Sequence, residues 1–416
     1  MKNKKNNLKI ALIAVSNQEI NFEQPILSDI TEGIYSIISP EDTLVKIPIS
    51  NNAHLNALQE KLSNVNLTLL LILNHKALEL ALNTIKTVNS PTLLMGLLEA
   101  KSFATCLKLR ELSPKQIISV FNIENWDNRV AKWFKREYTI AKGTVKLKNQ
   151  KIGVLGTPQF PITILKRKFS VKEIPIDELE VKTSGETKTK TTELLNTVRA
   201  YVDIDVQQVE KSIALAEAIR EIISTHQIDH IMLNCEEIAN RFSTTSCLTR
   251  ALLAEEGIIV GCGETPLSML SCVVFSSILE NPPWSAEIAS IDPAKNQILL
   301  AKCYIPLNLI GGISCAILQK DYDTGKGVAV TSDIKAKNLT LAKITEEGML
   351  CTLAKIISSN MMLENTCRAQ VLVRTEKSPL KLVSLNPGSP ISIIPGKSTE
   401  EIKLLTSRLG IKQIDL

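Results

Sequence analysis

The chain has 416 residues, of which 44% are hydrophobic and 22% are charged, and its formal net charge is +5. This composition is typical of a globular protein with several hydrophobic cores, and it excludes disordered, collagen-like and coiled-coil classes. Aromatic residues make up only 4%, and the one dense basic run is confined to residues 2–5, so we expect no nucleic-acid partner. No run of 18 apolar residues occurs, so we also expect no membrane partner.

Nine cysteines occur, without any C-x-x-C pair. A secreted disulfide scaffold would be smaller, and a structural zinc site would show paired ligands. We therefore expect reduced cysteines that pack as small apolar residues in a cytoplasmic protein. Residues 1–15 imitate a signal peptide, but their apolar part is too short, which favours a polar tail followed by a first strand.

Strands alternate with helices in the predicted N-terminal domain, residues 1–145. Continuous apolar runs indicate buried strands at 9–15, 43–47, 67–73 and 92–95. Helical spacing of apolar residues indicates helices at 28–38, 53–62 and 77–88. This alternation predicts a parallel sheet covered by helices on both faces. The polar residues 142–150 are interpreted as a linker.

The same pattern restarts in the predicted second domain, residues 146–285. Strands are expected at 151–157, 171–176, 229–233 and 257–261, and helices at 206–225, 245–256 and 267–279. Residues 180–192 are rich in Lys, Thr and Glu and are expected to form a mobile surface loop.

Short extended runs separated by Gly, Asn, Pro and Asp characterise the third predicted domain, residues 286–416. They lie at 297–302, 316–318, 327–331, 340–344, 369–374 and 391–394, and residues 400–409 form a closing helix. Such spacing predicts an antiparallel sheet or barrel. The predicted fold class is therefore α/β, with two doubly wound parallel-sheet domains followed by a small antiparallel β-rich C-terminal domain.

The densest polar signals follow two predicted strands of the second domain. Glu236 and Glu237 come after the strand at 229–233, and Glu264 comes after the strand at 257–261. Ligands of parallel sheets bind beyond the carboxyl ends of strands, so these carboxylates could hold a divalent cation or act as an acid/base pair. Alternatively, Glu236 and Glu237 begin an exposed helix, whose N-terminus favours negative charge.

The four histidines all precede residue 231, so a site in the C-terminal half must work without imidazole. His226 and His230 are four residues apart, which could place two metal ligands on one helical face. Because a turn into a strand is predicted between them, we expect a surface pair instead.

Three stretches resemble the superfamily of L-fucose and L-arabinose isomerases, especially its shorter fucose-isomerase-like members. They are residues 233–236 (LNCE), 245–248 (TSCL) and 257–264 (GIIVGCGE), and the likeness continues through 286–305, 325–328, 340–343, 367–371 and 394–396. The resemblance implies conversion of aldoses to ketoses with a Mn²⁺ ion held by Glu, Asp and His, while a carboxylate moves a proton between C1 and C2. It also implies a homo-oligomer, a trimer or hexamer.

The chain departs from that family at the positions that bind the metal. Thr265 stands where relatives carry the ligand Asp, and Pro390 and Ile391 stand where relatives carry histidines. Lys302 also replaces a histidine, and residues 321–325 (DYDTG) replace H-F-E-S-G. The comparison with the family therefore predicts that this chain has no metal site of the family type. Mn²⁺ is expected as a cofactor only if Glu264 helps to rebuild a metal site.

Two functions follow from this comparison. The first is a carbohydrate isomerase with a remodelled site, in which Glu236, Glu237 and Glu264 supply acid/base groups. The substrate pocket of this enzyme would be shaped by Thr265, Lys302 and Arg368. The second is a catalytically inactive relative that binds a sugar, polyol or other metabolite, or assembles with an active partner.

Overall fold

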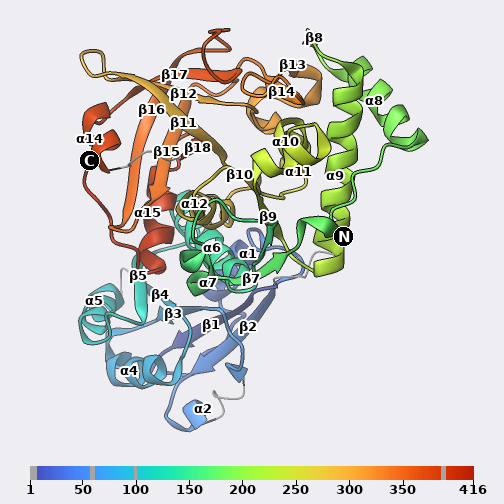
Figure 1. Cartoon of the computed structure of the whole chain (residues 1–416). Coiled ribbons are helices and arrows are strands. Elements are labelled where there is room, and N and C mark those ends of the chain that lie inside the picture. Colours follow the sequence, from blue (N-terminus) through green and yellow to red (C-terminus); the bar gives the residue numbers. More distant parts are fainter. Residues whose placement is uncertain (1–6, 57–60, 98–100, 386–389) are drawn as a thin grey trace. The chain divides into compact units, whose positions relative to one another are not determined.

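The computed structural model describes residues 7–56, 61–97, 101–385 and 390–416. The chain divides into two units, Met1–Lys146 and Leu147–Leu416. This division lies one residue from the predicted end of the first domain, and the predicted boundary at residue 285 falls inside the second unit. Parallel sheets and a C-terminal antiparallel barrel confirm the mixed α/β class (Figure 1).

The first unit contains a five-stranded parallel sheet in the order β2-β1-β3-β4-β5. Its strands are β1 (Lys9–Val15), β2 (Thr43–Ile49), β3 (Leu67–Ile72), β4 (Thr92–Leu97) and β5 (Ile117–Ile123). Its helices are α1 (Pro25–Tyr35), α2 (Ala53–Asn56), η1 (His75–Ala77), α4 (Leu78–Thr87), α5 (Ser102–Leu112) and α6 (Asn128–Lys148). Alternate residues of β1 pack against α1 and α6 on one face and against α4 and α5 on the other. Burial on both faces explains the continuous apolar runs of the central strands.

Three elements of this unit were not predicted: α5, β5 and α6. The interpretation of residues 142–150 as a linker is wrong, because α6 continues to Lys148. The buried residues of α6 include Val130, Phe134 and Tyr138, which recur at helical spacing, while charged residues such as Lys132 and Lys135 are exposed. The predicted helix at 53–62 is observed as α2, and residues 57–60 lie outside the described residues.

The second unit begins with sheet B, four parallel strands in the order β10-β9-β6-β7. Its strands are β6 (Lys151–Leu155), β7 (Ser170–Ile174), β9 (His230–Leu233) and β10 (Val260–Cys262). The helices of this part are α7 (Thr163–Lys168), η2 (Ile176–Glu178), α8 (Gly185–Thr197), α9 (Val206–His226), α10 (Cys235–Phe242), α11 (Cys247–Glu255) and α12 (Pro266–Ser276). Helix α10 follows β9. The sequence analysis expected a helix here only under the alternative interpretation of Glu236 and Glu237, as residues of a helix N-terminus.

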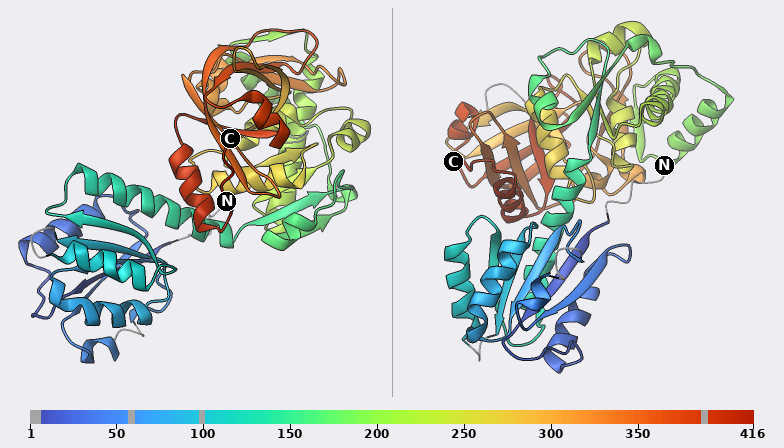
Figure 2. Two further views of the ribbon diagram at one scale, coloured as in Figure 1. Left: turned by 90° about the vertical axis from the view of Figure 1, so that its left-hand side faces the viewer. Right: turned by 90° about the horizontal axis from the view of Figure 1, so that it is seen from below.

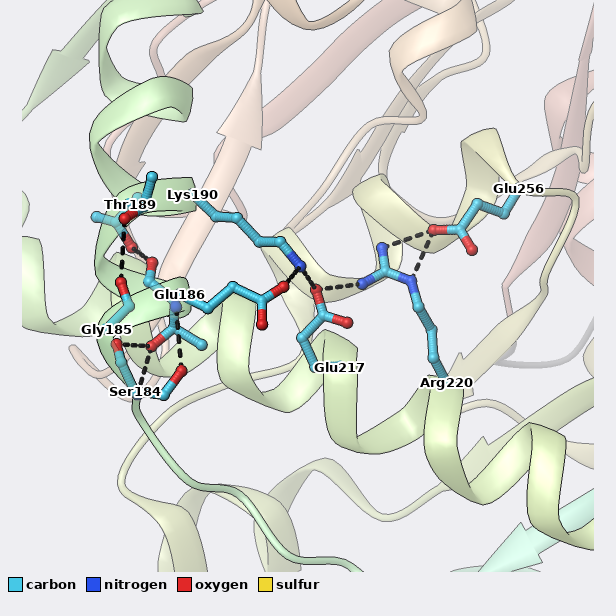
Figure 3. A network of polar contacts seen from close by, with 10 residues as sticks. Ser184, Gly185, Glu186, Thr189, Lys190, Glu217, Arg220 and Glu256 are labelled. Carbon is cyan, nitrogen blue, oxygen red and sulfur yellow. Dashed lines mark hydrogen bonds and ion pairs between the residues drawn. The ribbon is translucent and has the colours of Figure 1, made fainter.

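Helix α8 corrects the prediction of a mobile loop at residues 180–192. Ser184 caps the helix by accepting a hydrogen bond from the Thr187 amide at 3.3 Å, and the Ser184 amide donates to Thr187 Oγ1 at 2.7 Å. This reciprocal capping box satisfies backbone donors that a polar composition alone does not reveal. Lys190 then reaches Glu217 of α9 at 2.7 Å, and Figure 3 shows this network along the two helices.

A closed barrel of six strands forms the C-terminal part of the second unit, in the order β11-β12-β17-β16-β15-β18 (Figure 2). Its strands are β11 (Trp284–Asp292), β12 (Gln297–Lys302), β15 (Asn338–Ile344), β16 (Met349–Ser359), β17 (Ala369–Thr375) and β18 (Ile391–Pro395). Strands β11 and β16 were not among the predicted runs. A separate three-stranded sheet joins β8 (Ala200–Val202), β13 (Ile317–Lys320) and β14 (Val328–Thr331). The short helices are α13 (Leu307–Ile310), η3 (Ile313–Cys315) and α14 (Pro379–Leu385), and α15 (Thr399–Arg408) is the predicted closing helix.

One hydrophobic core connects the barrel to the α/β part of the second unit. It includes Val209 of α9, Leu248 of α11, Leu300 of β12 and Ile393 of β18. This shared core packs α9 and α11 against the barrel strands. Over the described ranges, no helix combines the length and hydropathy that a membrane span requires.

Candidate functional site

A polar pocket of about 600 Å³ lies at the carboxyl end of sheet B. Its lining residues come from the segment after β6 and from the start and exposed face of α10: Thr157, Asn234, Glu236, Glu237, Asn240 and Arg241. The carboxyl edge of a parallel sheet is where such folds usually bind ligands. The structure therefore brings two of the three predicted carboxylates, Glu236 and Glu237, into one pocket.

The first turn of α10 fixes the floor of this pocket. Asn234 caps the helix, because its Oδ1 accepts hydrogen bonds from the amides of Glu236 and Glu237 at 3.1 and 3.3 Å. Gln159 Nε2 donates to the same oxygen at 3.0 Å. The Thr157 amide donates to Glu237 Oε2 at 3.1 Å. Glu236 and Glu237 thus belong to a helix N-terminus and also line a pocket, so the two interpretations of the sequence describe the same place.

A glycine allows the Glu237 carboxylate to approach the loop after β6. Gly156 has a φ of 70°, and a Cβ at this position would collide with the Glu237 carboxylate. Both the left-handed conformation and the close approach require glycine. Gly156, which follows β6 directly, therefore allows a pocket residue to take its position.

Glu264, the third predicted carboxylate, lies in a different environment. Its side chain is buried, and Oε1 accepts a hydrogen bond from Arg250 Nη2 of α11. The Arg250 guanidinium lies 4.2 Å from the centre of the Tyr304 ring. Glu264 is not among the residues that line the polar pocket. Its predicted acid/base role stays a prediction, and its observed contact is an ion pair.

Thr265 and Pro390 also take part in local structure. Thr265 caps α12, where its Oγ1 accepts a hydrogen bond from the Ser268 amide at 3.3 Å. Ser268 Oγ donates to the Pro390 carbonyl at 3.1 Å. Ile391 begins barrel strand β18 and is buried, whereas Gly388 and Ser389 lie outside the described residues.

The residues at these positions do not fit the Mn²⁺ ion that the resemblance implies. The one carboxylate among them, Glu264, already pairs with Arg250. It also attracts the buried ammonium groups of Lys302 and Lys343. A dication beside Glu264 would therefore be repelled by Arg250, Lys302 and Lys343, of which Lys302 also pairs with Glu287.

The other two predicted pocket residues, Lys302 and Arg368, lie outside the lining of the polar pocket. Lys302 is buried on β12, with its Nζ 2.7 Å from Glu287 Oε1. Burial and Arg250 push the pKa of Lys302 down, but attraction from Glu264 and Glu287 outweighs them and raises it. The half-buried Arg368 donates from Nε to the Lys320 carbonyl at 3.4 Å.

The histidine pair is not a surface pair, contrary to the sequence expectation. His230 is buried within β9, where its Nδ1 accepts a hydrogen bond from the Ile259 amide at 3.2 Å. His226 is half-buried at the end of α9, with Nε2 2.9 Å from Glu178. Because one residue ends a helix and the other lies in a strand, the spacing of four does not place them on one helical face.

None of the nine cysteines forms a disulfide, and four of them are buried. Five cysteines nevertheless gather in two neighbouring groups that sequence analysis did not predict. Cys235 begins α10 and interacts with Cys262, the last residue of β10, and this interaction lowers the pKa of Cys235 to about 7. Cys247, Cys303 and Cys367 form the second group with Asp321. The available signal was the position of Cys235, Cys262 and Cys303 at predicted strand ends.

No protein-family model matches the sequence, and no curated protein is significantly similar to it.

Proposed function

We propose that this protein binds a sugar or polyol in the polar pocket at the carboxyl end of sheet B, as a relative of the fucose and arabinose isomerases that does not catalyse their Mn²⁺-dependent reaction. The observation that carries this proposal is the composition of the pocket lining. Two carboxylates, two amides, a hydroxyl and a guanidinium line this open pocket of about 600 Å³.

The chemistry of this lining matches a ligand with several hydroxyl groups. Carboxylates accept hydrogen bonds, a guanidinium donates them, and amides do both, so neighbouring hydroxyls can be bound in either role. Pockets for small molecules usually measure roughly 300–1,000 Å³. The volume therefore suits a monosaccharide or a polyol of similar size.

The separation of Glu264 from this lining argues against isomerisation in the manner of the family. That reaction requires a carboxylate and a metal ion beside the C1 and C2 atoms of the sugar. Glu264 is engaged by Arg250, and the surrounding lysines disfavour a dication. The Glu236 and Glu237 side chains then serve recognition of hydroxyl groups.

The resemblance adds two properties to this proposal. It favours a homotrimer or homohexamer, and it favours a cytoplasmic role in carbohydrate metabolism. Light scattering of the purified chain tests the first property directly, since a monomeric mass would contradict it.

Calorimetric titration with a panel of aldoses, ketoses, polyols and sugar acids tests the binding proposal. We expect one panel class to bind, and we expect Glu237→Gln to weaken its affinity at least about tenfold, because a charge-assisted hydrogen bond is lost. Glu173→Gln is the matched control, since Glu173 is an exposed carboxylate of β7 outside the pocket lining. Equal affinities of the wild type and Glu237→Gln would show that the ligand does not bind in the polar pocket.

A further inference from the structure

Four electron-rich side chains from distant parts of the sequence meet in the second unit. Cys247 begins α11, Cys303 follows β12, Asp321 follows β13, and Cys367 precedes β17 by two residues. Cys247 and Asp321 are buried, whereas Cys303 and Cys367 are half-buried. We call these four residues the thiol cluster.

The donor atoms of Cys247, Cys303 and Asp321 lie about as close together as the ligands of a tetrahedral zinc ion, and Cys367 adjoins this group through Cys303. Cys303 Sγ and Cys367 Sγ are 3.5 Å apart, and Cys247 Sγ is 3.9 Å from Asp321 Oδ1. The donor atoms of Cys247, Cys303 and Asp321 all lie within 4.8 Å of one another. With Zn–S bonds of about 2.3 Å and Zn–O bonds of about 2.0–2.2 Å, tetrahedral geometry requires sulfur–sulfur separations of about 3.8 Å and sulfur–oxygen separations of about 3.5 Å.

Neighbouring groups hold two of these side chains in a ligating orientation. Asp321 Oδ2 accepts hydrogen bonds from the amide and the hydroxyl of Thr324 at 3.0 and 2.9 Å, which leaves Oδ1 facing Cys247. Gln370 Nε2 donates to the Cys367 carbonyl at 3.0 Å and fixes the backbone of that ligand. Hydrogen bonds to the ligands from such outer residues are a regular feature of metal sites.

The chemistry of the donors selects among metal ions. Thiolates favour zinc and other soft or borderline ions over Mg²⁺, Ca²⁺ or Mn²⁺. Two unbonded sulfurs at 3.5 Å are too far apart for a disulfide, whose S–S bond is about 2.05 Å. Of the three thiols, Cys303 has a lowered pKa, whereas the pKa values of Cys247 and Cys367 are raised, so a bound dication would supply the charge that stabilises their thiolate forms.

We propose that Cys247, Cys303, Cys367 and Asp321 bind one zinc ion. This site is distinct from the Glu/Asp/His metal site of the isomerases, because it uses none of Glu264, Thr265, Pro390 and Ile391, the positions at which the resemblance places metal ligands or their replacements. It ties α11 and the three-stranded sheet to barrel strands β12 and β17. The zinc proposal does not depend on sugar binding. An experiment that refutes the zinc site would therefore leave the proposed function untouched, and the reverse also holds.

Cobalt substitution of the full-length, reduced and chelator-treated protein tests the site. We expect one Co²⁺ per chain, with a thiolate-to-cobalt charge-transfer band and the intense d–d bands of tetrahedral coordination, and we expect Zn²⁺ to displace it. Cys303→Ser should weaken Zn²⁺ binding by roughly 100-fold or more, since outer-shell changes alone cost 10–100-fold. The control is Cys351→Ser, a half-buried cysteine of β16 outside the thiol cluster, which should bind as the wild type does.

A second variant guards against a folding artefact. Asp321→Asn keeps the size of the side chain and should shift the d–d bands and weaken binding, while circular dichroism confirms that the protein is folded. Absence of stoichiometric Co²⁺ binding by the reduced wild type would overturn the proposal. Unchanged spectra in both Cys303→Ser and Asp321→Asn would overturn it as well.

Discussion

The buried ion pair between Arg250 and Glu264 makes a quantitative prediction about stability. Arg250 is 4% exposed and Glu264 is 1% exposed, so neither charge is solvated by bulk water. Arg250→Met keeps much of the apolar volume of the side chain and leaves the Glu264 carboxylate without its cation. We expect a loss of about 3–5 kcal/mol in the free energy of unfolding, the usual cost of removing one partner of a buried pair.

Two further variants separate charge from geometry in this pair. Arg250→Lys keeps the positive charge but loses the planar contact with Tyr304, so it should cost less than Arg250→Met. Arg220→Met is the surface control, since Arg220 pairs with Glu256 at 2.6 Å and both side chains are about one-third exposed or more. That variant should cost at most about 1 kcal/mol.

Hydrogen exchange under native conditions, read by mass spectrometry, measures these costs within the second unit. Peptides that cover β9 and β10 report the opening of sheet B separately from the first unit. We expect faster exchange in Arg250→Met across these strands and little change in Arg220→Met. Equal exchange in the two variants would refute the view that Glu264 is held as one half of a buried ion pair.

Two more predictions concern stability. Burial lowers the pKa of Lys343 to about 8, against opposing effects of Cys272 and Glu264. Between about pH 8 and 10.5 the unfolded chain therefore binds this proton more strongly, so Lys343 should contribute up to about 3 kcal/mol of stability that rises with pH across this window. Buried thiols such as Cys106 and Cys272, whose pKa burial raises, contribute in the opposite direction, so the contribution of Lys343 is read as the difference between the wild type and Lys343→Met. Lys343→Met should abolish that rise and be more stable at pH 7 in urea denaturation, and identical pH profiles would contradict the assignment. Ser184→Ala removes the α8 cap and should cost about 1 kcal/mol locally, visible as faster exchange of α8 amides, whereas unchanged exchange would show that the capping box contributes nothing.

The sequence predicted the coarse fold well where burial alone determines the pattern. Strands covered on both faces, such as β1 and β3, appear as continuous apolar runs, and the short runs after residue 286 indicated antiparallel strands. Helical segments that consist mostly of polar and charged residues were not predicted. Helix α8 resembled a disordered segment and the end of α6 resembled a linker, because capping and packing against neighbours are tertiary features.

The candidate site was predictable only in part. The place of Glu236 and Glu237 in the pocket was predictable, because they directly follow a strand of sheet B. Residues that follow a parallel strand lie at the carboxyl edge of its sheet, and this can be read from their order along the chain. The partner of Glu264 could not be predicted, since Arg250 lies on α11 and Glu264 in the loop before α12, so their contact depends on how α11 packs. The thiol cluster was hidden for the same reason, because its four members are spread over 121 residues of the chain.

One measurement tests the central claim, that the protein binds a sugar or polyol without isomerising it. Ligand-observed nuclear magnetic resonance in D₂O, with Mn²⁺ added at catalytic concentrations, reports binding and hydrogen exchange at C1 and C2 in one sample. We predict binding of one class of sugar or polyol through the polar pocket, with no exchange of these hydrogens over many hours. Deuterium incorporation at C1 or C2, or formation of the matching ketose, would contradict the claim, as would the absence of binding across the whole panel.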